Sequence, residues 1–157
     1  MGVMLRRSAE MALPMRALRM VAAALAVTLL VACQPAGTPM TLDGVTLLRY
    51  GPGVGARTAL YEGTLRFRDG CIWVESPQGT GAVVLWPSDA RLELVDGNVH
   101  VIVGQVSMTE GDPVQLGGGQ YLREELADVE RLVGPVPASC VADMYWMAGL
   151  VNKRSSS

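Results

Sequence analysis

The sequence predicts a mainly β domain with one late helix, and three observations carry that prediction. Short apolar segments alternate with turn residues between Val45 and Val106, as in strands joined by tight loops. Asp-Gly pairs stand at the centres of two expected hairpins. A single later stretch has the period of an amphipathic helix. Half of the 157 residues are hydrophobic, and the chain also holds 18 Gly and 9 Pro. It is therefore turn-rich, yet apolar enough to form a core.

The first hairpin is expected within residues 60–75, around Asp69 and Gly70. Polar and apolar residues alternate along its first strand, and both central positions of a two-residue loop favour positive φ. The loop turns four apolar side chains toward the core: Leu65, Phe67, Ile72 and Val74. Arg66 then lies opposite Trp73 on the other face, which makes them a candidate cation–π pair and the candidate ligand-binding residues. Core packing is the alternative interpretation of this tryptophan.

A second hairpin is expected around Asp96 and Gly97 for the same reason. Its core face is expected to hold Leu92, Leu94, Val99 and Val101. Glu93 would lie opposite His100 on the outer face. Between the two hairpins, residues 82–86 (AVVLW) are apolar on both faces, which predicts a central strand.

The last third of the chain predicts a strand, a helix and a closing strand. One more strand or arc is expected from Val106 and residues 114–116, and the glycines at 117–119 are expected to end the β section. Apolar residues then recur at helical spacing over about three turns: Leu122, Leu126, Val129 and Val133. Gly134-Pro135 should end this helix, and residues 144–151 (MYWMAGLV) read as a buried strand. This order predicts a small closed or partly closed β-barrel, OB-like, with a β-sandwich as the alternative.

The N-terminal segment has the pattern of a secretory signal. Arginines at positions 6, 7, 16 and 19 precede an uncharged apolar stretch, residues 20–32. As a helix this stretch would be about 20 Å long, whereas a hydrocarbon core is ~30 Å thick. A signal is therefore favoured over a membrane span. Four methionines are candidate start sites: Met1, Met4, Met11 and Met15.

The stretch ends in Leu30-Val31-Ala32-Cys33, which resembles the lipobox of bacterial lipoproteins. The resemblance implies that Cys33 carries a diacylglyceryl thioether with palmitate-like chains, and that a signal peptidase cuts before it. The expected organisation is a signal peptide at 1–32, the lipidated cysteine and a linker at 33–43, the β domain at 44–151 and a disordered tail at 152–157. The lipid would hold the domain outside the cytoplasm, on the cell membrane or the outer membrane.

A second resemblance concerns the domain itself. The segments GCIWVES, VLWP and GDPVQLGGG, with a late cysteine followed by Tyr-Trp, are similar to a small β domain of uncharacterised bacterial envelope proteins. The similarity covers roughly residues 63–151 and implies no function.

Cys71 and Cys140 remain after Cys33 is lipidated. Two cysteines in an exported domain can be oxidised, so we expect a disulfide between the first hairpin and the start of the last strand. Two separate thiols are the alternative. The bond would close a loop of about 70 residues, which is worth on the order of 4 kcal/mol in the chain-entropy model.

Charge and composition argue against several functions. The chain after residue 32 has nine basic and 14 acidic side chains, a net charge of −5, so nucleic acid is not an expected partner. His100 is the single histidine and has no recognisable companions for a zinc site or a catalytic dyad. The sequence assigns no catalytic residue, no metal ligand and no cofactor.

The first hypothesis for function is a lipid-anchored envelope protein whose non-catalytic β domain binds a protein or a glycan. The alternative is an envelope hydrolase with an unrecognised site. A concave pocket with converging polar groups would favour the enzyme. A flat or grooved aromatic patch would favour the binding module.

Overall fold

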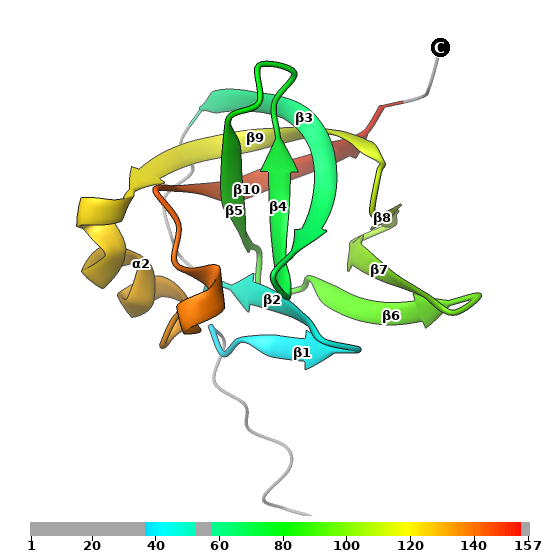
Figure 1. Ribbon diagram of the computed structural model, residues 1–157, viewed down its shortest axis with the longest axis horizontal. Helices are drawn as coiled ribbons and strands as arrows, with labels where there is room; N and C mark the ends of the chain where they lie inside the picture. The colour runs from blue at the N-terminus through cyan, green and yellow to red at the C-terminus, as the bar shows by residue number, and fades with distance from the viewer. Residues whose placement is uncertain (1–36, 53–57, 155–157) are drawn as a thin grey trace, which may run out of the picture. The chain divides into compact units, whose positions relative to one another are not determined.

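The computed structural model describes residues 37–52 and 58–154. Within them the chain is mainly β, with one late α-helix, as the sequence predicted (Figure 1). The strands are β1 (Met40–Leu42), β2 (Val45–Arg49), β3 (Ala59–Arg68), β4 (Cys71–Glu75), β5 (Gly81–Trp86), β6 (Arg91–Val95), β7 (Asn98–Val103), β8 (Val106–Thr109), β9 (Pro113–Leu122) and β10 (Met144–Lys153). The helices are α2 (Leu126–Val133) and two 3-10 turns, η1 (Arg123–Glu125) and η2 (Ala138–Cys140). None of these helices combines the length and apolarity that a membrane crossing requires. The signal segment and Cys33 lie outside the described residues.

Five strands pair in a ring. β4 pairs with β3, β3 with β9, β9 with β10, β10 with β5, and β5 returns to β4. All these pairings are antiparallel except β10 with β5, which is parallel. Because the pairings return to the starting strand, these strands form a ring, in agreement with the predicted closed or partly closed arrangement. Five is also the strand number of an OB fold.

The Asp69-Gly70 hairpin is confirmed. Both residues have positive φ, at 54° and 75°, as a two-residue loop between twisted strands requires. The predicted opposite pairs are present, including Arg66 with Trp73. Leu65, Ile72 and Val74 are fully buried inside the ring, and Phe67 packs against them.

β5 is the central strand that its sequence predicted. Ala82, Val84 and Trp86 belong to the cluster inside the ring, whereas Val83 and Leu85 belong to a second cluster outside it. Helix α2 completes this second cluster with Val129 and Val133, and β10 adds Tyr145 and Met147. The strand is therefore buried on both faces because the ring core covers one face and α2 covers the other.

β6, β7 and β8 form a separate three-stranded sheet. The register of its first hairpin is as predicted, with Leu92 opposite Val101 and Glu93 opposite His100. The expected burial of Leu94 is wrong, because this side chain is 54% exposed. Leu94 lies on β6, the edge strand of this sheet, whereas Val99 opposite it on β7 is buried in the ring core.

A third Asp-Gly hairpin lies in the segment that we expected to be a linker. β1 pairs with β2 across Asp43 and Gly44, which both have positive φ. The same sequence signal that predicted the other two hairpins was present here. The domain therefore begins before residue 44. At the other end β10 runs to Lys153, into the segment expected to be a disordered tail.

The three glycines at 117–119 do not end the β section. β9 continues through them to Leu122 and pairs with β10 along its whole length, apart from one irregularity near Gly149. A Cβ on Gly118 would overlap the carbonyl oxygen of Met147. Position 118 therefore requires a glycine, because β10 lies too close for a side chain at this point.

The helix is confirmed from residue 123 onward, but Leu122 is not part of it. Leu122 is the last residue of β9 and is 39% exposed. Its N–H donates to the Glu125 carboxylate at 2.7 Å, which stabilises the start of the helical segment. Gly134 ends the helix with φ of 80°, as Gly134-Pro135 predicted.

Candidate functional site

A cleft of about 750 Å³ lies between β3 and the turn that joins β4 to β5. Its volume is in the range of small-molecule and peptide-side-chain sites. Pro113 and Arg154 complete the lining from the start of β9 and the end of β10. Arg154 is held there by its backbone, whose N–H donates to the carbonyl of Pro113 at 3.0 Å.

The cleft forms because β4 ends while β3 continues, with β9 paired to the opposite edge of β3. Residues 64–68 of β3 pair with β4, whereas residues 59–64 pair with β9. Thr64 and Glu75 are the last pair between β3 and β4. Two residues further along each strand, Glu62 would face Pro77, which has no N–H to donate, so the ladder stops before that point. The chain then turns away toward β5 and leaves a gap beside the first half of β3.

Gly63 lies on the cleft lining, where β3 passes the end of β4. A Cβ at this position would overlap the carbonyl oxygen of Glu75. The glycine therefore permits the close approach of the two strands at the base of the cleft.

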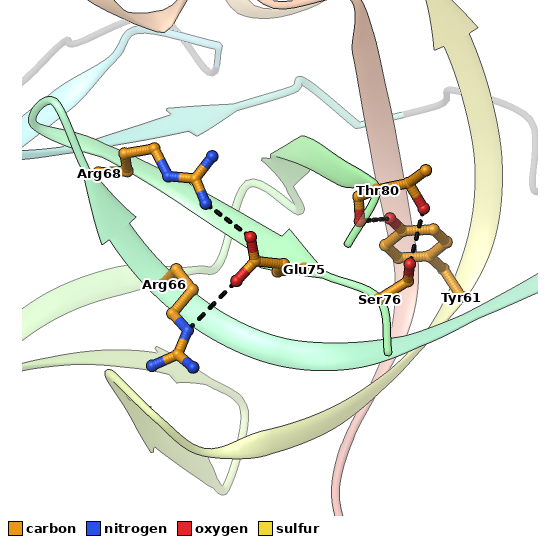
Figure 2. Close-up of polar contacts among 6 residues, drawn as sticks. All are labelled: Tyr61, Arg66, Arg68, Glu75, Ser76 and Thr80. Atoms are coloured by element: carbon orange, nitrogen blue, oxygen red, sulfur yellow. Dashed lines mark hydrogen bonds and ion pairs between the residues drawn. The ribbon is translucent and has the colours of Figure 1, made fainter. Parts of the chain in front are cut away.

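The β4–β5 turn is held rigidly by hydrogen bonds. The Ser76 N–H donates to the Thr80 carbonyl at 2.8 Å, and the Gly79 N–H donates to the Ser76 carbonyl at 2.9 Å. The hydroxyls of Ser76 and Thr80 lie 2.6 Å apart, and the Tyr61 hydroxyl donates to the Thr80 carbonyl at 3.0 Å (Figure 2). Tyr61 is fixed in turn because its ring stacks on the buried Trp146, with centroids 5.0 Å apart. The walls of the cleft are thus preorganised.

Charged side chains on the cleft are arranged in two clusters. Glu75 accepts from Arg68 at 2.8 Å and lies 3.6 Å from Nε of Arg66 (Figure 2). Glu62 pairs with Arg154 at 3.3 Å and also accepts from the Gln115 amide. Each carboxylate is therefore engaged by at least one cationic or amide donor.

Asp112 adjoins the cleft in the turn before Pro113. Burial raises the pKa of Asp112, but this effect is outweighed by hydrogen bonds from Lys153 and the Thr109 N–H and by the positive charges of Lys153 and His100. The net result is a pKa below the ordinary value for an aspartate. Lys153 Nζ lies 2.7 Å from the carboxylate, so this ion pair ties the end of β10 to the turn beside the cleft.

The two predicted ligand-binding residues lie opposite each other in the hairpin, but only one of them lines the cleft. Arg66 lines the cleft, but Trp73 does not. The cation–π contact is made by Arg68 instead, whose Cζ lies 5.3 Å from the Trp73 ring centroid. Arg68 shares the face of Arg66 two residues along the strand, and Arg66 is drawn toward Glu75. The prediction of a cation–π pair between Arg66 and Trp73 is therefore wrong, because Arg68 makes this contact instead of Arg66.

Trp73 is half-buried against the cluster beneath α2, and Gly81 leaves the space beside its ring. We expect Trp73→Ala to lower the free energy of unfolding by about 3 kcal/mol, at the low end of the range for a buried tryptophan. Trp86→Ala, at a fully buried position, should cost more. Urea unfolding of both variants measures the difference. An unchanged stability of Trp73→Ala would show that this ring is available to a partner.

The sequence reasoning missed most of the cleft. Glu75 could have been found, because the predicted hairpin places it diagonally across from Arg66 on the same face. Arg154 could not, because only the pairing of β10 with β9 brings it to Pro113. Tyr61 packs against the ring core, and its hydroxyl is the part that reaches the cleft.

Cys71 and Cys140 lie at disulfide-bonding distance, as expected, with Cα atoms 5.5 Å apart. Both are fully buried in the cluster beneath α2. The pair joins the start of β4 to η2, the turn that precedes β10.

His100 has one neighbour that the sequence did not reveal. Its Nδ1 lies 2.9 Å from the Ser107 hydroxyl on the adjacent strand β8. Neither residue lines the cleft. Across the part of the chain that the structure describes, no group of three or more His, Cys, Asp or Glu is placed to hold a metal ion.

Comparison with known proteins returned no match: no family model fits the chain, and no curated protein or solved structure is significantly similar to it.

Proposed function

We propose that this protein is a lipid-anchored component of a bacterial cell envelope whose non-catalytic β domain binds another protein in the cleft beside β3. The observation that best supports the proposal is the presence of this cleft. It is preorganised by the β4–β5 turn and it exposes charged and hydrogen-bonding groups on both walls. Preorganised walls lower the entropic cost of binding.

Anchoring through Cys33 is supported by the sequence. Gly37, the first described residue, follows Cys33 by four positions. Four residues of extended chain span at most ~14 Å. A lipid on Cys33 would therefore keep the domain close to the membrane surface, where partners in the envelope are concentrated.

The chemistry of the cleft favours binding over catalysis. Its lining contains no histidine, cysteine or lysine among the described residues. The Ser76 hydroxyl faces Thr80 rather than a general base. A hydrolase that uses Ser107 and His100 is the second candidate, favoured by their 2.9 Å contact. The pair lies outside the cleft beside β3 and outside the smaller cleft between residues 37–39 and 130–135.

In-cell photo-crosslinking tests the proposal. A photoreactive residue at Gln78, on the cleft turn, should crosslink one defined envelope protein in an exporting bacterium. The same residue at Gln105, equally exposed in the β7–β8 turn, is the matched control and should not. Mass spectrometry of the same preparation should find a lipid-modified Cys33 at the N-terminus. In Cys33→Ser the modification and the membrane-fraction crosslink should both be lost, because a hydroxyl cannot replace the thiolate nucleophile.

Two outcomes would contradict these proposals separately. An unmodified Cys33 in the wild-type chain would end the lipid anchor. Equal crosslinking from Gln78 and Gln105 would end the cleft as the binding site. Covalent labelling of Ser107 by a fluorophosphonate probe would favour the hydrolase instead.

A further inference from the structure

We infer that the cleft receives an extended acidic peptide, which adds as a strand to the open edge of β3 while Arg66 binds its carboxylate. This inference rests on the proposed function and names the chemistry of the partner. Three observations support it. Backbone groups of β3 lack a strand partner beside the cleft, the charged groups around the cleft favour an anion, and the tryptophans are not exposed in the cleft.

The direction of the β3 backbone groups follows from alternation along an antiparallel strand. The Leu65 N–H donates to Asp112, and the Leu65 carbonyl accepts from Gly111, so the backbone groups of Leu65 face away from β4. Those of Thr64 and Arg66 therefore face β4. No irregularity interrupts β3, so the N–H and carbonyl groups of Glu62 and Leu60 face the same side.

That side is open beyond Thr64. β4 has ended, Pro77 stands where the next partner would be, and no strand of the described residues pairs with Leu60 or Glu62 there. The N–H and carbonyl of Glu62, on the cleft lining, and those of Leu60, two residues beyond it, thus have no strand partner on this side. An unpaired edge of this kind is a template for another extended chain, and strand addition supplies affinity through main-chain hydrogen bonds.

The charge around the cleft favours an acidic peptide. The lining itself holds two arginines, Arg66 and Arg154, and two carboxylates, Glu62 and Glu75. With the adjoining groups Arg68, Lys153 and Asp112, four cationic side chains stand against three carboxylates, in a chain of net charge −2. The cleft is therefore locally positive on an acidic protein, which attracts anionic ligands.

Arg66 is the group best placed to bind a carboxylate. Its Nε faces Glu75, while its two terminal nitrogens point away from that carboxylate (Figure 2). No residue that the structure describes accepts a hydrogen bond from those terminal nitrogens. The side chain is 44% exposed and lines the cleft. A guanidinium in this state can bind a carboxylate with two parallel hydrogen bonds.

A glycan is less favoured because the cleft offers no exposed aromatic platform. Trp86 and Trp146 are buried, and Trp73 lies under Arg68 outside the cleft. One face of the Tyr61 ring is already covered by Trp146. Glycan binding is an outcome of the test below.

The test uses the full-length chain in detergent and an immobilised library of pentapeptides with one fixed Asp. A second library carries Asn at that position, and an array of acidic oligosaccharides is the third arm. We expect peptides of the Asp library to bind at least tenfold more tightly than their Asn counterparts. N-methylation of alternate backbone nitrogens in the bound peptides should weaken them at least tenfold, because it removes the donors that meet β3.

Variants connect binding to the residues. Arg66→Ala should weaken the peptides at least tenfold, and Arg66→Lys should restore only part of the affinity, because a lysine cannot bind bidentately. Arg91→Ala removes a similarly exposed arginine in the separate sheet, 49% exposed and paired with Glu93, and should change nothing. Hydrogen exchange should show slower exchange of the Leu60 and Glu62 amides with peptide bound. Thermal melts of all variants exclude loss of fold.

The results distinguish the two levels of the proposal. Equal binding to the Asn library, or to Arg66→Ala, would overturn the acidic peptide. Binding only on the oligosaccharide array would overturn the peptide but keep the cleft as a site. If Gln78 gives a specific crosslink in cells and no peptide binds, the proposed function stands and this inference fails. If both experiments are negative, both fail.

Discussion

Removal of the Cys71–Cys140 bond is expected to lower the free energy of unfolding by about 4 kcal/mol. The two residues are 69 positions apart, and a crosslink over a loop of this length removes a large part of the conformational entropy of the unfolded chain. The bond also holds η2 against the buried cluster beneath α2. The chain continues from η2 directly into β10, a strand of the ring. The double variant Cys71→Ala, Cys140→Ala avoids placing hydroxyl groups in this apolar cluster.

Urea unfolding of the wild-type chain with and without reductant, and of the double variant, measures the effect. The reduced wild-type chain and the double variant should be destabilised to a similar extent. Reductant should change nothing further in the double variant, which is the control. Equal stability of the wild-type chain in both conditions, or two labelled thiols in exported protein, would contradict the disulfide.

Gly118→Ala should be at least as damaging, with a loss of about 4 kcal/mol or more or a failure to fold. The added Cβ would overlap the carbonyl oxygen of Met147 and would come within 3.2 Å of the Trp146 indole nitrogen. These contacts cannot be relieved by a side-chain rotation, because one of them is backbone. β9 and β10 would have to separate where the ring closes, and such strain belongs to the largest effects of single substitutions.

Gly149→Ala is the matched control in the facing strand. Its added Cβ would have the Gly117 carbonyl at 3.7 Å as its nearest neighbour, which is an ordinary contact. Stability should therefore change by less than about 1 kcal/mol. Thermal and urea unfolding of both variants provide the comparison. A folded Gly118→Ala chain of wild-type stability would show that β9 and β10 are further apart than described.

Part of the candidate site was predictable from the sequence. Arg66 lines the cleft, and its face was predictable because the Asp69-Gly70 loop determines which residues of the hairpin share a face. Trp73 shares that face but is covered by Arg68, and the alternation of a strand says nothing about what lies above it. The open edge at Glu62 arises where β4 ends while β3 continues, held on its opposite edge by β9, which lies some 50 positions further along the chain.

The sequence by itself determined the local structure. Asp-Gly pairs select positive φ, so the hairpins at residues 69–70 and 96–97 follow from backbone sterics within four residues. The same rule predicts a hairpin at Asp43-Gly44, in the segment that we expected to be a linker. The two-sided burial of β5 and the end of α2 at Gly134 follow from equally short patterns.

Only the tertiary structure decided how these elements meet. The parallel pairing of β10 with β5 closes the ring between segments about 60 residues apart, and no local preference encodes it. That closure turns the Gly117–Gly119 run from an expected loop into the interior of β9, and it carries Arg154 into the cleft. Pairings between strands that are distant in the sequence depend on which apolar faces of the hairpins remain exposed after each hairpin has formed. That is a property of the whole chain, whereas φ and ψ are limited by neighbouring residues alone.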